Sequence, residues 1–180
     1  MSVALLVTVG SDYHPFDRLV GGVDAWLDQA AQIGSVVVQY GTARKPRHGE
    51  CLDYLPHDRL LEQLRSVDVV VTQGGPMGIV EARRCGRIPI VMPRLHRLGE
   101  VVDDHQVAFC RQLASTGDIV LVETVEELRR ALDRAADDPS QLALTATAAE
   151  VDTKEAVDAF AQAVDGLPPR RPGLARWRRH

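Results

Sequence analysis

The residues best suited to chemistry lie between positions 72 and 106 of this 180-residue sequence. Gly74 and Gly75 closely follow a β-branched apolar run at residues 67–71, and Pro76 comes next, where a helical run begins. Glycines let the backbone come close to an anion, and proline is preorganised for the first turn of a helix, whose free N–H groups and dipole favour negative charge. This strand, turn and helix are therefore predicted to hold a phosphate.

Carboxylate, imidazole and amide groups follow the glycine turn at spacings that suit the rest of a nucleotide sugar. Glu81 lies on the helix after the turn, where its carboxylate is placed to accept two ribose hydroxyls; the alternative is a solvated surface group. Asp104, His105 and Gln106 stand at the start of a later helix and are expected to face the ligand; for His105 and Gln106 the alternative is a hydrogen bond to a neighbouring loop. Asp103, just before them, is expected to cap that helix.

The positions of apolar residues indicate how these groups are held. Strands and helices alternate, and the strands are continuous apolar runs, which is typical of a parallel sheet covered by helices on both faces. The fold class is therefore predicted to be α/β, with one Rossmann-like domain and a parallel sheet. Strands are expected at residues 2–9, 35–40, 52–55, 67–71, 88–92 and 119–122. Helices are expected at residues 16–31, 57–67, from 76, from 103 to 113, after Thr124 with a Thr124–Glu127 capping box, and at 153–164.

Ligands of open parallel sheets bind outside the carboxyl ends of the strands. Gly10 and Ser11 follow the first predicted strand, Gln73 and the glycine turn follow the fourth, and residues 93–96 follow the fifth. Because these loops open on one edge of the sheet, we expect them to converge on one ligand. His14 is a candidate base, since imidazole titrates near neutral pH, with a polar loop residue as the alternative. Arg94 is a candidate phosphate contact, with a solvated or partner-facing side chain as the alternative.

Composition limits the functional classes. Residues 1–166 are predicted to form one domain, and residues 167–180, rich in proline and arginine, an extended tail that is solvated or contacts an acidic partner or anionic lipid. The remaining body is acidic, which argues against nucleic-acid binding. The absence of a signal peptide or membrane span predicts a cytoplasmic protein. Three cysteines without paired spacing predict reduced structural thiols and no metal site.

Two enzyme classes lack their sequence signatures. A nicotinamide-dependent reductase needs a Gly-x-Gly-x-x-Gly turn after the first strand, and here Gly10 stands there alone. A serine hydrolase needs a Gly-x-Ser-x-Gly elbow, which is missing. Neither class is therefore favoured.

Several segments resemble the carboxy-terminal, donor-binding domain of glycosyltransferase family 28. They are Val-Thr-Val-Gly-Ser at residues 7–11, Pro-Phe-Asp-Arg-Leu-Val at 15–20, Pro-Arg-Leu-His-Arg-Leu-Gly-Glu at 93–100 and Asp-His-Gln at 104–106. The resemblance extends over roughly residues 2–135. It is closest to the short catalytic subunit of two-part bacterial exopolysaccharide glycosyltransferases, and the eukaryotic dolichol-linked N-acetylglucosamine transferase is split similarly.

The resemblance implies the carboxy-terminal half of a GT-B enzyme, an inverting transferase that moves a sugar from a UDP-sugar to a lipid-linked saccharide acceptor without a metal or other cofactor. Glu81 would hold the ribose, and His105 and Gln106 would contact the donor sugar and its leaving phosphate. The diphosphate would face the residues of two loops: Gly10, Ser11, Gly74, Gly75 and Pro76. A membrane-anchored subunit would bring the acceptor and the main general base, holding this chain at the inner face of the membrane.

One residue departs from the family pattern. Many relatives have a histidine where this chain has Gln73, and glutamine donates a hydrogen bond but cannot become a cation. Phosphate stabilisation is then expected to be weaker, or to fall to His105, Arg94 or Arg97. The alternative function is a non-catalytic nucleotide-sugar-binding or regulatory module.

Overall fold

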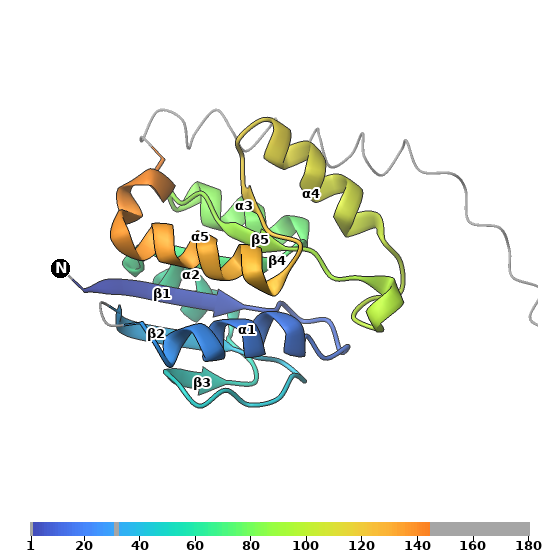
Figure 1. Cartoon of the computed structure of the whole chain (residues 1–180), viewed down its shortest axis with the longest axis horizontal. Helices are drawn as coiled ribbons and strands as arrows, with labels where there is room; N and C mark the ends of the chain where they lie inside the picture. The colour runs from blue at the N-terminus through green and yellow to red at the C-terminus, as the bar shows by residue number, and fades with distance from the viewer. Residues whose placement is uncertain (1, 31–32, 145–180) are drawn as a thin grey trace, which may run out of the picture.

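A computed structural model describes residues 2–30 and 33–144 of the chain (Figure 1). Its strands are β1 (Val3–Thr8), β2 (Ile33–Gln39), β3 (Glu50–Leu52), β4 (Val69–Gln73), β5 (Ile90–Met92) and β6 (Val120–Leu121). Within these ranges they form one six-stranded sheet in the order β3-β2-β1-β4-β5-β6, and every neighbouring pair is parallel. The predicted α/β class with a parallel sheet is confirmed.

Helices cover both faces of this sheet. They are α1 (Asp17–Leu27), α2 (His57–Ser66), α3 (Pro76–Arg84), α4 (His105–Ser115) and α5 (Val125–Asp137), with short 3-10 turns η1 (His96–Leu98) and η2 (Pro139–Leu142). The apolar side chains of α1 and α5 join one core cluster, whereas those of α2, α3 and α4 belong to two clusters on the opposite face. The domain therefore has three layers, with α1 and α5 side by side on one face (Figure 1).

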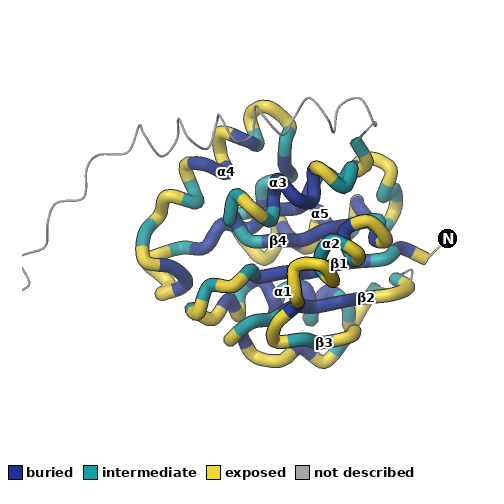
Figure 2. Tube along the Cα trace, turned by 180° about the vertical axis from the view of Figure 1, so that it is seen from behind, coloured by how far each residue is buried: buried dark blue, intermediate teal, exposed yellow. Residues whose placement is uncertain are grey.

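The central strands are apolar throughout because successive side chains enter different cores. In β1, Leu5 and Val7 pack beneath α1 and α5, while Leu6 packs on the other face with α2. In β4, Val71 joins the core beneath α1 and α5, and Val70 joins the core on the α2 face. Figure 2 shows these strands as the buried centre of the molecule. Such burial is worth about 25 cal/mol per Å² of apolar surface, so the sheet supplies a rigid platform for its carboxyl edge.

Most predicted elements are present, with shifted ends. The third strand is Glu50–Leu52, earlier than the predicted 52–55, because Val37 to Gln39 of β2 pair with residues 50 to 52. Leu55 instead turns inward and is buried against α2. The capping box of α5 is confirmed, since Thr124 and Glu127 each accept a hydrogen bond from the backbone of the other. The predicted helix 153–164 and the tail lie outside the described residues.

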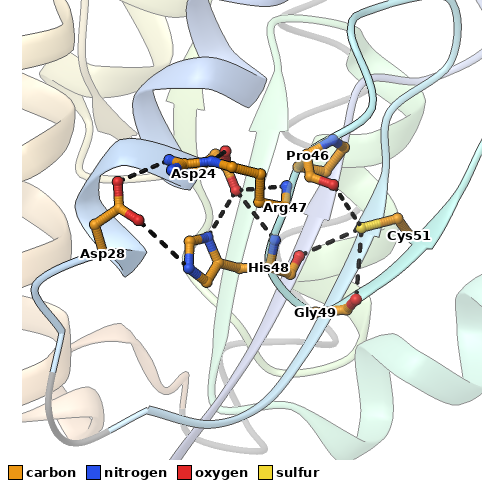
Figure 3. Close-up of polar contacts among 7 residues, drawn as sticks. All are labelled: Asp24, Asp28, Pro46, Arg47, His48, Gly49 and Cys51. Carbon is orange, nitrogen blue, oxygen red and sulfur yellow. Dashed lines mark hydrogen bonds and ion pairs between the residues drawn. The ribbon is translucent and has the colours of Figure 1, made fainter.

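A carboxylate on α1 anchors the long loop between β2 and β3 (Figure 3). Oδ1 of Asp24 accepts hydrogen bonds from the backbone N–H groups of Arg47 and His48, at 2.9 and 3.1 Å. The Arg47 Nε donates to Oδ2 at 2.9 Å, and the His48 Nδ1 lies 2.8 Å from Oδ1. Asp28 adds an ion pair with Arg47 at 2.7 Å. These contacts fix the course of the loop that leads through β3 to residues 53–55.

The charge of Asp24 makes this anchor sensitive to acid. Burial raises the pKa of Asp24, but hydrogen bonds from His48 and Arg47 outweigh that effect and hold the pKa at about 2, against an ordinary 3.8. A pKa lowered by folding stabilises the fold above the ordinary value, and the contribution is lost as pH falls through about 2. The size of the shift corresponds to about 2 kcal/mol.

We therefore expect Asp24→Asn to lower the free energy of unfolding at pH 7 by about 2 kcal/mol, and to lose less stability than the wild type between pH 4 and pH 2. Urea denaturation at several pH values measures both effects. Glu62→Gln is the control, because that carboxylate is exposed and 3.7 Å from Arg59. Equal stability of Asp24→Asn and wild type at pH 7 would contradict the prediction.

Candidate functional site

A cleft of about 360 Å³ opens at the carboxyl edge of the sheet, beside the ends of β1, β2 and β4 and between α2 and α3. The wall on the α2 side is largely apolar and includes Leu55, Leu60 and Leu64. The opposite wall is formed by the glycine turn and the first turns of α3. Six of the predicted site residues line the cleft: Gly10, Ser11, Gln73, Gly75, Pro76 and Glu81. The ends of the first and fourth strands thus meet at one cleft, whereas residues 93–96, after the fifth, do not line it.

Two of the glycines lie directly against one side chain. Gly10 has a φ of +71°, and a Cβ built there would lie 2.3 Å from the Gln73 Nε2. A Cβ on Gly75 would lie 2.9 Å from the same nitrogen. The carboxamide of Gln73 is therefore packed between the first loop and the glycine turn, where a phosphate is predicted to bind.

Arg94 lies beneath these loops with its side chain fully buried. Its Nε donates to the Gln73 Oε1 at 2.7 Å. Its terminal nitrogens donate to three backbone carbonyls, those of Val9 at 2.9 Å, His14 at 2.8 Å and Glu100 at 3.0 Å. The expected direct phosphate contact, and the alternative of a solvated side chain, are both corrected: the guanidinium is enclosed and bonded to protein acceptors.

Glu81 sits on α3 with 7% of its surface exposed and faces the cleft. Its Oε1 lies 2.8 Å from the Nε2 of His57, at the start of α2. His57 was not among the predicted site residues, because no spacing rule connects two positions 24 residues apart on different helices. Tyr54 and Met77 were missed as well; both line the cleft and are 64% exposed.

Four further predicted residues, Gly74, Asp104, His105 and Gln106, lie at the start of α4 or against it and do not line the cleft. Gly74 leaves no room for a side chain, since its Cβ would lie 2.8 Å from the Cys110 Sγ, and Gln106 accepts a hydrogen bond from the Arg94 backbone at 3.2 Å. These two residues seat α4 against the glycine turn. His105 is half-exposed. Its contact with a donor sugar stays a prediction.

Of the two aspartates before α4, Asp103 makes a capping contact as expected, whereas Asp104 does not line the cleft. Asp104, expected to face the ligand, is the N-cap residue, yet its carboxylate accepts from the backbone N–H of His96 at 2.9 Å. Asp103, expected to cap, accepts from the backbone N–H of His105 at 3.2 Å. The reason is the tight turn of the 93–104 loop, which brings residue 96 within reach of residue 104.

His14 is held by the carboxylate of Asp12, with its Nδ1 at 2.6 Å from Oδ1. Burial raises the pKa of Asp12, but hydrogen bonds from His14 and the charge of Arg94 bring the pKa below its ordinary value. An ionised carboxylate only accepts hydrogen bonds, so Nδ1 carries the proton. The Nε2 of a neutral His14 is then an acceptor, which is the arrangement a general base needs.

The three cysteines are poor nucleophiles. Burial raises the pKa of Cys110 to about 12 and raises the pKa values of Cys51 and Cys85. Because the thiolate is the reactive form, these side chains are structural. Among the residues that the structure describes, no helix combines the length and apolar character that a membrane span requires.

The chain belongs to the glycosyltransferase family 28 C-terminal domain family, whose model matches residues 4–163. A comparison with curated protein sequences gives no match. Among solved structures, the glycotransferase of kitacinnamycin is similar with 21% identity and a TM-score of 0.62, over 91% of this chain and 42% of that one. MurG of Acinetobacter baumannii has 17% identity and a TM-score of 0.57, over 92% of this chain and 49% of its own. The calicheamicin glycosyltransferase CalG4 has 16% identity and a TM-score of 0.53, over 91% of this chain and 41% of its own.

At these identities the solved structures establish the fold, which is that of one half of a GT-B glycosyltransferase. The chain spans less than half the length of each of these three proteins.

The packing of Gln73 between two glycines gives a test of the site. We expect Gly10→Ala to lower the free energy of unfolding by about 2 kcal/mol, because a side chain at positive φ is strained and meets the Gln73 carboxamide. Gly10→Ala combined with Gln73→Ala should recover part of this loss, since the clash is removed. Gly21→Ala is the control: nothing lies within 4 Å of its Cβ, and alanine favours the helix there. Urea denaturation measures all three variants, and equal losses at both glycines would contradict the assignment.

Proposed function

We propose that this chain is the donor-binding subunit of an inverting glycosyltransferase, which moves a sugar from a UDP-sugar to a lipid-linked saccharide acceptor together with a membrane-anchored partner subunit. The observation that carries the proposal is the buried Glu81, which faces a cleft at the strand-end glycine turn of a family 28 domain. The reaction serves polysaccharide or glycolipid synthesis, and the chain works peripherally at the cytoplasmic face of the membrane.

We assign each part of UDP to a group that lines the cleft. The apolar side chains Leu55 and Leu60, with Tyr54 at the rim, offer a surface for a flat base. Glu81 provides acceptors for the ribose hydroxyls. Gln73 and the backbone N–H groups that begin α3 provide donors for the diphosphate. No metal or other cofactor enters this proposal.

The chemistry assigned to these groups is a single displacement. An acceptor hydroxyl attacks the anomeric carbon from the face opposite UDP, the bond to the β-phosphate oxygen breaks, and UDP leaves with increased negative charge. Fixed N–H donors at that charge stabilise the transition state, typically by several kcal/mol. The acceptor proton goes to a base, either on the partner or the Nε2 of His14, which Asp12 orients.

The partner is supported by the surface of the domain. Three apolar side chains are exposed on loops at the carboxyl edge of the sheet: Tyr13 at 73%, Leu98 at 50% and Val102 at 56%. The loops that carry them meet at one end of the molecule (Figure 1), where the Arg94 side chain joins residues 14 and 100. Exposed apolar groups in one region mark interaction surfaces. We place the acceptor subunit there.

A second candidate function is a non-catalytic module that binds a nucleotide sugar and regulates a partner. Gln73 favours it, because a neutral amide stabilises a leaving phosphate less than a histidine cation. Both functions need the UDP site, and only the enzyme needs a base.

We expect UDP and UDP-sugars to bind the wild-type chain and to bind Glu81→Gln at least tenfold more weakly, because the amide replaces one of the two carboxylate acceptors. Ligand-observed NMR with UDP, UDP-glucose, UDP-galactose and UDP-N-acetylglucosamine measures this and ranks the sugars. NAD is the negative ligand, and Glu62→Gln, an exposed carboxylate outside the cleft, is the matched control. Unchanged uridine signals with the wild type would contradict the proposed site.

If His14 is the base of the enzyme, His14→Gln co-expressed with the acceptor subunit should lose at least a hundredfold in transfer rate while UDP binds as before. A transfer assay with a membrane fraction measures the rate, and NMR measures binding. Full activity of His14→Gln would assign the base to the partner. An assembled wild-type complex that binds UDP-sugar without transferring it would favour the regulatory module.

A further inference from the structure

We propose that Arg94 is a positioning residue that orients the carboxamide of Gln73, so that the NH₂ group of Gln73 faces the diphosphate of the donor. This inference rests on the proposed function, because it concerns the same cleft. It replaces the direct phosphate contact expected of Arg94 with an indirect one, through the amide.

The chemistry of the contact decides which end of the amide faces the cleft. Arginine only donates hydrogen bonds, so the Gln73 atom that lies 2.7 Å from the Arg94 Nε must be the carbonyl oxygen. The amide nitrogen is then on the other side, against Gly10 and Gly75. Within the described part of the chain no group accepts a hydrogen bond from this nitrogen, and Gln73 lines the cleft. Its N–H groups are therefore available to a ligand.

Arg94 itself has little freedom to move. Its other hydrogen bonds run to backbone carbonyls of the first loop and the 93–104 loop, and its Cζ lies 4.6 Å from the centroid of the Phe16 ring. A reversed amide would point NH₂ at the guanidinium and lose the charge-assisted hydrogen bond. Such bonds are roughly twice as strong as neutral ones, so the observed orientation is strongly favoured.

The result is a neutral donor whose direction is set before the ligand arrives. Preorganised donors need no rearrangement when charge develops, which is the property that stabilises a leaving phosphate. The Arg94 guanidinium is buried on the protein side of the amide. There it polarises the amide and has no contact with solvent. This arrangement explains how a glutamine can act as the donor at the position before the glycine turn.

A double-mutant cycle tests whether Arg94 acts through Gln73. We expect Gln73→Met, which keeps the length of the side chain and removes its donors, to weaken UDP binding about tenfold and leave uridine binding unchanged. Arg94→Lys should have a similar effect, because lysine cannot bond the amide and the three carbonyls together. Combining Arg94→Lys with Gln73→Met should cost no more than either change alone. Titrations with UDP and with uridine, followed by NMR, give the affinities.

Arg83→Lys is the matched control, since Arg83 is also buried but pairs with Asp118 at 3.0 Å, outside the cleft. Its effect should add to that of Gln73→Met. Additive losses for Arg94→Lys and Gln73→Met would overturn the positioning role and leave the proposed function intact. A wild-type chain that binds neither UDP nor uridine would overturn both.

A second variant keeps the test decisive if circular dichroism shows that Arg94→Lys does not fold. In Gln73→Glu, one carboxylate oxygen can still accept from Arg94, and the other takes the place of the NH₂ group. We expect an unchanged or higher melting temperature, unchanged uridine binding and a loss of UDP affinity of about a hundredfold, from repulsion between the two anions. UDP binding equal to that of the wild type would overturn the inference.

Discussion

The buried guanidinium of Arg94 is the interaction on which the carboxyl edge of the sheet depends. It joins the loop after β1, the end of β4 and the loop after β5, three segments that are far apart in the sequence. Burial lowers the pKa of Arg94, while the charges of Asp12 and Glu100 oppose that shift. A buried charge is costly unless its hydrogen bonds are made, so the loops are stable together in this arrangement and not in others.

An ion pair next to these hydrogen bonds supports them. Arg18 of α1 donates to both carboxylate oxygens of Glu100, at 2.9 and 2.8 Å, and to the backbone carbonyl of Pro93 at 2.7 Å. Glu100 in turn accepts from the backbone N–H of Leu95 at 2.9 Å. The loop that carries Arg94 is thus fixed to α1 and to itself. The hydrophobic layers define the sheet, and this polar network defines the shape of its edge.

This division explains what could be predicted from the sequence. The layers follow from local patterns: apolar runs predict β1 and β4, and the Thr124 capping box predicts the start of α5. The glycine turn and Glu81 belong to one strand-turn-helix unit, so their common place in the cleft was predictable too. The burial of Arg94 and the His57–Glu81 contact were not, because each depends on how separate loops or helices meet. Arginine and histidine between polar residues look like surface groups until the partners from other elements are known.

The same network connects the two surfaces on which the proposed function relies. Arg94 bonds the side chain of Gln73 in the cleft, and it also bonds the backbones of residues 14 and 100, next to the exposed Tyr13 and Leu98. A partner that packs on these apolar side chains would restrain the loops that hold the amide in place. A bound diphosphate would restrain the amide from the other side. Each binding event orders loops that the other event would otherwise have to order. Donor binding and partner docking should therefore favour each other, and each should raise the affinity of the other by the same factor.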